Sequence, residues 1–163
     1  MRRLNYPDRH HLSAALGWLE LGDVREAESE LRLITEQDHP EVLEVCWRRA
    51  AYKKNWSLAL EVARQIVQKA PDWPEGWIHQ SYTLHELRRT EEAWNELLSV
   101  AARITEESVI PYNLACYACQ MGNLAGAKNW LRKAAQLQSK EEIRKAALND
   151  PDLAPIRDYV QAL

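Results

Sequence analysis

The chain has 163 residues, of which 46% are hydrophobic and 28% are charged, and its formal net charge is −3. This balance is typical of soluble globular proteins and excludes a disordered or collagen-like chain, while the weak negative charge argues against nucleic acid or an anionic membrane as partner. With only 5 glycines and 7 prolines, the chain has too few turn residues for many short strands, so the sequence predicts an all-α fold.

The first seven residues carry two arginines but no apolar run behind them, so we do not expect them to form a secretory signal. No apolar stretch approaches the roughly 18 residues that a membrane span requires. The 3 cysteines are an odd number and lie at apolar positions of helical patterns. This usage fits a reducing cytoplasm better than a disulfide framework, and we expect a cytoplasmic protein without a membrane partner.

Four segments of the chain repeat one pattern around a single alanine. The four alanines are separated by 32, 34 and 34 residues, and they are Ala27, Ala59, Ala93 and Ala127. Each follows a turn signal by four or five residues, and apolar residues come four and seven positions later, which is one face of a helix. The turn signals are Gly22-Asp23, Lys54-Asn55, Arg88-Arg89-Thr90 and Gly122-Asn123. A second helical pattern of about 14 residues precedes each turn, so every segment predicts a helix, a short turn and a second helix.

These segments resemble tetratricopeptide repeats. The best match, residues 112–127, has the leucine and small residue of the first helix, the turn glycine Gly122 and the second-helix alanine Ala127. The third repeat adds Trp77 and starts with proline and glutamate, as does the second. The resemblance implies a right-handed α-solenoid of four helix hairpins, at about 8–39, 40–73, 74–107 and 108–138. Each hairpin exposes an apolar face that only its neighbour can cover.

Trp47 departs from the repeat pattern, because it stands where the family prefers a small residue. Its counterparts in the other repeats are Ala15, Ser81 and Ala115. The step from the first to the second repeat is also two residues short. Local repacking explains both departures best, and a specialised pocket lined by Trp47 is the alternative.

The periodicity stops after Leu137, and residues 139–163 are expected to form C-terminal capping helices. Ser139 and Glu142 have the spacing of a capping box, which predicts a helix over 140–148. A second amphipathic segment covers 152–163. Three roles are open for this last segment: it completes the cap, lies in the groove of the array, or mediates dimer contacts.

The sequence offers no catalytic constellation, cofactor motif or metal site. Cys116 and Cys119 form a C-x-x-C pair, but a zinc site wants four ligands, and a redox pair usually opens a helix. This pair lies in the middle of a predicted helix, where helix packing explains it. No nucleotide-binding or hydrolase motif occurs, and we expect a non-enzyme without cofactor.

Resemblance to the family implies that the first helix of each repeat lines a concave groove. Carried over position by position, the expected partner-binding residues are Glu44, Arg48, Tyr52, Ile78, His79, Tyr82, His85, Tyr112, Asn113 and Cys116. Only Asn113 matches the lysine, asparagine and arginine set of the repeats that bind chaperone carboxylates, so that ligand is disfavoured. Tyrosine and arginine are favoured in binding sites because they bury large areas and keep a hydrogen-bonding tip.

The predicted function is therefore a protein-interaction adaptor that binds a peptide or partner segment in this groove. Leu12, Leu16 and Leu19 form one end of the groove, unless the segment 1–7 covers them. The alternatives are a self-associating structural module that forms a homodimer, and a chaperone similar to those of type III secretion translocators.

Overall fold

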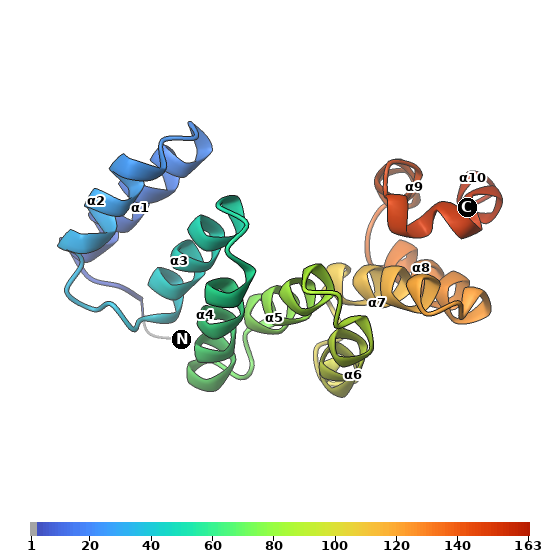
Figure 1. Ribbon diagram of the computed structural model, residues 1–163. Helices are drawn as coiled ribbons and strands as arrows, with labels where there is room; N and C mark the ends of the chain where they lie inside the picture. Colours follow the sequence, from blue (N-terminus) through green and yellow to red (C-terminus); the bar gives the residue numbers. More distant parts are fainter. Residues whose placement is uncertain (1–2) are drawn as a thin grey trace. The chain divides into compact units, whose positions relative to one another are not determined.

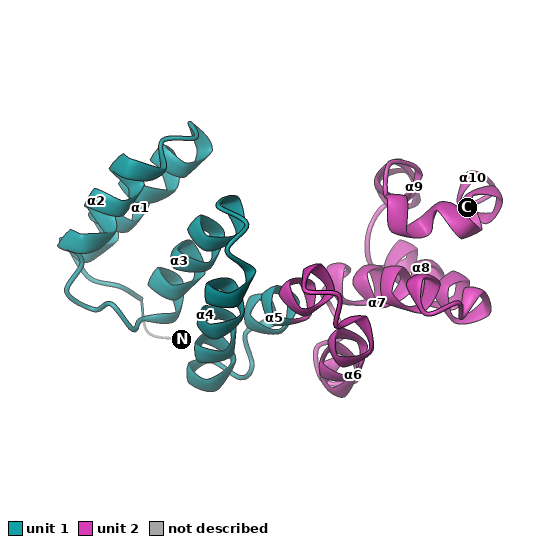
Figure 2. Cartoon of the chain, in the orientation of Figure 1, with its two compact units in different colours: residues 1–80 teal, residues 81–163 magenta. Residues whose placement is uncertain are grey.

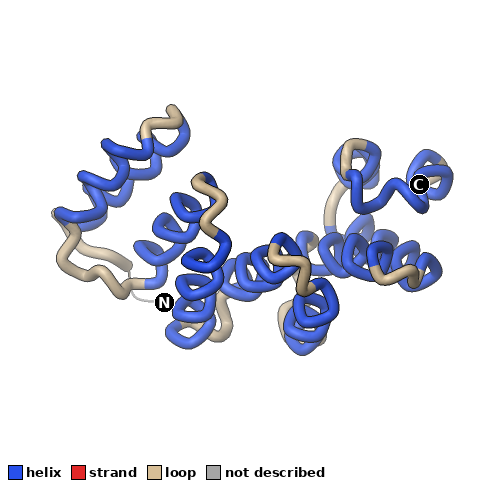
Figure 3. Tube along the Cα trace, viewed as in Figure 1, coloured by secondary structure: helices blue, strands red, loops and turns tan. Residues whose placement is uncertain are grey.

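The computed structural model describes residues 3–163, and within them the secondary structure consists of helices and connecting loops without a strand (Figures 1 and 3). This confirms the predicted all-α fold. The α-helices are α1 (Asp8–Glu20), α2 (Val24–Leu33), α3 (Pro40–Tyr52), α4 (Trp56–Lys69), α5 (Pro74–Glu86), α6 (Thr90–Val100), α7 (Val109–Gln120), α8 (Leu124–Leu137), α9 (Lys140–Leu148) and α10 (Arg157–Gln161). A 3₁₀-helix, η1 (Pro151–Ile156), lies between α9 and α10.

All four predicted turns share one backbone conformation. Their first residues have positive φ values of 80°, 54°, 62° and 79°, at Gly22, Lys54, Arg88 and Gly122 respectively. A left-handed residue is the usual way to end one helix and reverse the chain toward the next. The turns therefore repeat with the same spacing as the alanines.

Asparagine and aspartate side chains cap three of the four second helices. Asp23 accepts hydrogen bonds from the backbone N–H groups of Arg25 and Glu26, Asn55 accepts one from Leu58, and Asn123 accepts one from Gly126. These bonds satisfy N–H groups that lack a partner within the helix. The repeat with Arg89 at this position has no side-chain cap.

The repeated alanines are the points where neighbouring helices come together. Ala27, Ala59, Ala93 and Ala127 are each fully buried. The helices that flank the turns lie side by side in the pairs α1–α2, α3–α4 and α7–α8 (Figure 1). A methyl group at these positions lets two backbones approach closely, which a larger side chain would prevent.

The chain forms two compact units, residues 1–80 and 81–163, and the border falls inside α5 (Figure 2). In unit 1, Leu4 packs in one buried cluster with Leu12, and Leu16 and Leu19 lie against that cluster. Leu4 of the segment 1–7 is thus part of the cluster in which Leu12 is buried. Residues 1 and 2 of that segment lie outside the described residues.

The start of α1 is tied to the loop after α2 by the buried carboxylate of Asp8. Its Oδ2 atom accepts hydrogen bonds from the Thr35 backbone N–H at 2.9 Å, the Thr35 hydroxyl at 2.7 Å and the Glu36 N–H at 2.8 Å. The Thr35 hydroxyl, with further help from the Glu36 N–H, lowers the pKa of Asp8 below its ordinary value.

In unit 2, α7 is the central helix, and most of its residues are buried. Tyr117 is 2% exposed, and its hydroxyl donates a hydrogen bond to the Ser81 hydroxyl at 3.3 Å. Leu114 and Ala115 of the same helix are fully buried. A helix apolar on nearly all sides must be surrounded by others, and α6, α8 and η1 all contact α7.

The C-terminal region forms the predicted helix over 140–148, but the expected capping box is absent. Ser139 is the N-cap residue of α9 and its side chain makes no capping hydrogen bond. Instead the Gln138 amide donates to Glu142, which takes the glutamate away from Ser139. The expected helix over 152–163 is broken into η1 and α10, because Pro155 lies inside this segment and lacks the N–H group that an α-helix uses.

Candidate functional site

Unit 1 presents two of the expected binding residues on one face of α3. Arg48 and Tyr52 are four residues apart, so their side chains lie one turn apart on the same face. The Arg48 side chain is 55% exposed and Tyr52 is 60% exposed. Tyr52 also lies beside the first turn, because a Cβ added to Gly22 would stand 3.3 Å from the Tyr52 hydroxyl oxygen.

A buried carboxylate one turn earlier holds the arginine. Glu44 is 9% exposed, and its Oε1 atom lies 2.5 Å from the Nε atom of Arg48. The same oxygen lies 3.6 Å from Nε2 of His79. Burial of Glu44 raises its pKa, but the hydrogen bonds with His79 and Arg48 outweigh burial, and the pKa is lowered overall. Glu44 is therefore a carboxylate that fixes Arg48, with little of its own surface exposed to a partner.

His79 is a packing residue, and it accounts for the unusual tryptophan. Its ring is stacked on Trp47 with the ring centroids 3.6 Å apart and an interplanar angle of 8°. Trp47 also packs against a buried cluster of Leu43, Val62 and Ile66. The Trp47 ring is thus used in local packing, as the first of the two interpretations expected. Ile78, the remaining expected residue of unit 1, is half-buried.

In unit 2, the expected binding residues contact a segment of the chain itself. The Tyr112 hydroxyl donates a hydrogen bond to Oδ2 of Asp150 at 3.0 Å, and the Cys116 thiol lies 3.5 Å from the same oxygen. Nε2 of His85 lies 2.8 Å from Oδ2 of Asp152. The Gln120 amide donates to the Asp152 carbonyl oxygen at 3.2 Å. We call His85, Tyr112, Cys116 and Gln120 the donor cluster.

The residues that the donor cluster contacts lie at the start of η1: Asp150 is its N-cap, and Pro151 to Leu153 are its first three residues. We call Asp150–Leu153 the 150–153 segment. Asp150 also caps η1, because its Oδ1 atom accepts a hydrogen bond from the Asp152 N–H. Leu153 is 1% exposed, whereas Pro151 is exposed. Two carboxylates and a leucine thus point toward the protein, with a proline between the carboxylates that points away.

His85 is oriented by a second hydrogen bond. Its Nδ1 atom lies 3.0 Å from the Thr90 hydroxyl, while Nε2 faces Asp152. Since an ionised carboxylate only accepts hydrogen bonds, the proton of this contact belongs to Nε2. The imidazole of His85, 9% exposed, is therefore fixed between two partners.

Burial beside two carboxylates makes the acidic groups of this region hard to ionise. Burial raises the pKa of Tyr112 and of Cys116, and the negative charge of Asp150 raises both further. Burial likewise raises the pKa of Tyr82, with the charge of Glu86 as the next cause. These hydroxyl and thiol groups stay protonated at neutral pH and act as hydrogen-bond donors.

A pocket of about 390 Å³ opens beside the 150–153 segment. Tyr82 and Asn113, both expected binding residues, line it together with His85, Cys116 and Tyr117. Glu86 of α5 also lines the pocket, and the remaining lining residues were not expected to bind a partner, namely Ala146, Asn149, Asp150, Pro151 and Asp152. Asn149-Asp150-Pro151 was readable as a helix stop, but no sequence signal placed its side chains on α7.

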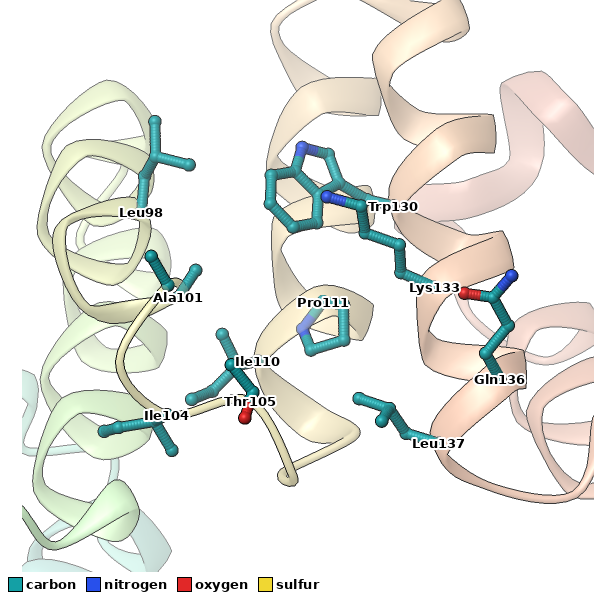
Figure 4. Close-up of a pocket in the computed structure, with 11 residues that line it drawn as sticks. Leu98, Ala101, Ile104, Thr105, Ile110, Pro111, Trp130, Lys133, Gln136 and Leu137 are labelled. Carbon is teal, nitrogen blue, oxygen red and sulfur yellow. The ribbon is translucent and has the colours of Figure 1, made fainter.

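A second pocket in unit 2 is apolar and lies among α6, α7, α8 and the loop after α6. It has a volume of about 400 Å³. In Figure 4, Leu98 stands across from Trp130, and Pro111 lies below Trp130 in this view. Nζ of Lys133 lies over the Trp130 ring, 4.0 Å from the ring centroid. Leu98 is 39% exposed and Leu137 is 44% exposed, so the pocket presents apolar surface to solvent.

The cysteines are unpaired thiols inside the helices. Cys116 and Cys119 are buried on α7, and Cys46 is half-buried on α3. Among residues 3–163, no group of three histidine, cysteine or acidic residues is arranged to hold a metal ion. No helix in the described part of the chain has the length and apolar character to cross a membrane.

Comparison with known proteins identifies the fold through structure alone. No family model matches the chain, and no curated protein matches it in sequence. A thermophilic tetratricopeptide-repeat protein of Thermus thermophilus, TTC0263, has a TM-score of 0.77 at 20% identity, over 95% of this chain and 87% of that one. PilF of Pseudomonas aeruginosa has a TM-score of 0.77 at 22% identity, over 95% of this chain and 68% of that one.

MamA of Desulfovibrio magneticus RS-1 is similar over 98% of this chain and 94% of its own, with a TM-score of 0.71 at 15% identity. The chain therefore has the tetratricopeptide-repeat fold, as its repeated turns and alanines predicted. The TM-scores establish the fold, and at these identities the similarity shows the fold alone.

Proposed function

We propose that this protein is a non-catalytic interaction module that binds a peptide or partner segment through the first helices of its repeats. The observation that carries the proposal is the pair Arg48 and Tyr52 on α3. An isolated exposed arginine loses conformational freedom on binding, but Glu44 already fixes Arg48 in the unbound protein. Tyr52 offers a large ring and a hydroxyl one turn away, and arginine and tyrosine are residues that dominate binding energies.

The other expected residues have different parts in this proposal. Tyr82, 38% exposed, and the half-buried Asn113 supply the accessible side chains of unit 2, since both line the 390 Å³ pocket. Glu44 holds Arg48 through their ion pair, and His79 lies beside the same Glu44 oxygen. The non-enzymatic character rests on the absence of catalytic motifs in the sequence, and the free cysteines support a cytoplasmic location.

The test is affinity capture from source lysate with the full chain and two double variants. Arg48→Ala/Tyr52→Ala removes the proposed contacts. Arg32→Ala/Tyr6→Ala is the matched control, because Arg32 is 75% exposed and pairs with a glutamate four residues earlier, and Tyr6 is 84% exposed. Circular dichroism melts confirm that each variant is folded.

We expect proteins captured by the wild type to remain with the control variant and to be lost with Arg48→Ala/Tyr52→Ala. Equal capture by both variants would contradict a role for this face of α3. Mass spectrometry of the differential fraction identifies the partner.

Self-association is a second candidate function, and the apolar pocket of unit 2 favours it. A second copy that inserts an apolar side chain between Leu98 and Trp130 would cover this surface. Light scattering of the wild type beside Leu98→Glu tests this candidate. A dimer mass lost in the variant supports it, and a monomer mass for the wild type excludes it.

A further inference from the structure

The contact between the donor cluster and the 150–153 segment has the composition of a recognition site. Three side chains of α7 and one of α5 direct hydrogen-bond donors at two carboxylates and one carbonyl oxygen. In the segment, Asp150, Asp152 and Leu153 face the protein, and Pro151 is exposed. A capping segment held by apolar contacts alone would not need this arrangement of donors.

The donor cluster is built from groups that water can satisfy. Tyr112, Cys116 and Gln120 are neutral donors, and within the described residues no lysine or arginine pairs with Asp150. The fourth member, His85, lies 2.8 Å from Asp152 and forms an ion pair with it only when its ring is protonated. Withdrawal of the segment would therefore leave no buried lysine or arginine without a counter-charge, which is the expensive outcome when a permanent ion pair is broken. The hydrogen bonds of the cluster can therefore pass to water at modest cost.

The segment itself has little internal stability. η1 is a six-residue 3₁₀-helix, a conformation with poorer hydrogen-bond geometry than an α-helix, and it contains Pro155. Its position depends on contacts with α7, α8 and α9 and on the burial of Leu153. A competing segment that supplies the same contacts would replace all of them.

The neighbouring pocket provides an entry position for such a competitor. It has a volume of about 390 Å³, and its lining includes Cys116 and His85 of the donor cluster as well as both carboxylate residues of the segment. An incoming chain seated there would lie next to the donors before the internal segment leaves.

We propose that the 150–153 segment is an internal ligand of the donor cluster, and that an acidic partner segment of the form Asp-x-Asp-Leu binds by replacing it. This inference rests on the proposed function, in that first-helix faces bind partner segments, and adds the chemistry of one partner. The two aspartates of the partner segment reach Tyr112 and His85, as Asp150 and Asp152 do in the unbound protein. The leucine of the partner segment takes the place of Leu153.

The experiment uses a fluorescein-labelled peptide spanning residues 148–156 and the full-length chain. The variant Asp150→Asn/Asp152→Asn weakens the internal contact while asparagine can still cap η1. Asp158→Asn is the matched control, because it makes the same change at an exposed carboxylate of α10. A peptide with both aspartates replaced by asparagine tests the requirement for charge.

We expect the acidic peptide to bind the double variant at least about tenfold more tightly than the control variant, and the asparagine peptide to lose that binding. Absence of binding to every variant, or equal binding of both peptides, overturns the inference. In that case Arg48 and Tyr52 would be unaffected, because they lie outside the donor cluster, and the capture experiment above decides their role separately.

Hydrogen exchange of the wild type keeps the test valid if the double variant does not fold. The Asp152 and Leu153 amides, which bond to Asp150, are expected to exchange at least about tenfold faster than buried amides of α7. Exchange of both groups at the same rate, through global unfolding only, overturns an exchangeable internal ligand.

Discussion

The substitution Leu153→Ala measures how strongly the C-terminal region is held to unit 2. Leu153 lies in η1 and is 1% exposed, and η1 contacts α7, α8 and α9. The change deletes three buried carbon atoms, which at about 0.8 kcal/mol for each gives about 2.4 kcal/mol of lost transfer free energy. A residual cavity adds to this, so we expect a destabilisation of about 3 kcal/mol.

Leu98→Ala is the matched control for this substitution. It deletes the same atoms from a side chain that is 39% exposed and lines an open pocket. Less transfer free energy is lost there and no closed cavity forms, so the expected destabilisation is about 1 kcal/mol or less.

The assay is urea unfolding followed by circular dichroism and by tryptophan fluorescence. If the two probes coincide, linear extrapolation gives the free energy of unfolding for each variant. Equal destabilisation by the two substitutions, or no measurable effect of Leu153→Ala, would refute the conclusion that η1 is packed into unit 2.

Three further predictions test the repeat and the contacts of a buried carboxylate. Ala127→Leu is expected to destabilise by about 1 to 3 kcal/mol in urea unfolding because the methyl group is fully buried, whereas Ala125→Leu, exposed on the same helix, should change little. Gly122→Ala is expected to lower the free energy of unfolding by about 1 kcal/mol, since φ is +79° and the added Cβ would have no neighbouring atom within 4 Å. Gly22→Ala should lower it more, because the added Cβ would lie 3.3 Å from the Tyr52 hydroxyl oxygen. Asp8 has a lowered pKa in the folded protein, so its stabilising contribution is present above the ordinary value of 3.8 and is lost as the pH falls through the lowered value. Asp8→Asn is therefore expected to reduce the loss of stability measured by urea unfolding between about pH 5 and about pH 2.

Each of these predictions has a result that contradicts it. Equal effects of the two alanine substitutions would mean that the repeated alanine is not a close-packing position. A smaller effect at Gly22 than at Gly122 would show that the Tyr52 contact is not made. If Asp8→Asn loses as much unfolding free energy as the wild type when the pH falls, Asp8 does not contribute to the acid sensitivity.

The repeated part of the fold was predictable because each repeat has the same pattern of turn residues, apolar positions and a small alanine. Positive φ values occur where the turn signals stand, even at Lys54 and Arg88, which lack the freedom of glycine. The sequence therefore identified these turns through their spacing, since residue type alone would have marked only two of them. Trp47 was recognised as a departure, but its stacking partner His79 lies 32 residues away and could not be found from a periodic pattern.

The sequence predicted the first-helix residues of the candidate site but not the 150–153 segment that contacts them. The resemblance to tetratricopeptide repeats implied that Tyr112, Cys116 and His85 lie on first-helix faces, and the structure brings them together around Asp150 and Asp152. His85 and Asp152 are 67 residues apart, and the path of the chain between them depends on how η1 packs. Periodicity identifies the face of a helix but not the segment that lies on it. Three roles were therefore open for residues 152–163 from the sequence, and the contacts of Asp150 and Asp152 with α7 and α5 were found only in the structure.

Site-specific photocrosslinking at Tyr52 is the most direct test of the central claim, that the first-helix face of α3 binds a partner. Tyr52 is replaced by p-benzoylphenylalanine in the full chain, and Tyr6, which is 84% exposed, is replaced in a parallel control. We predict a discrete crosslinked product from position 52 that is missing at position 6 and is lost when Arg48→Ala is added. No product at position 52, or the same products at both positions, would contradict the claim.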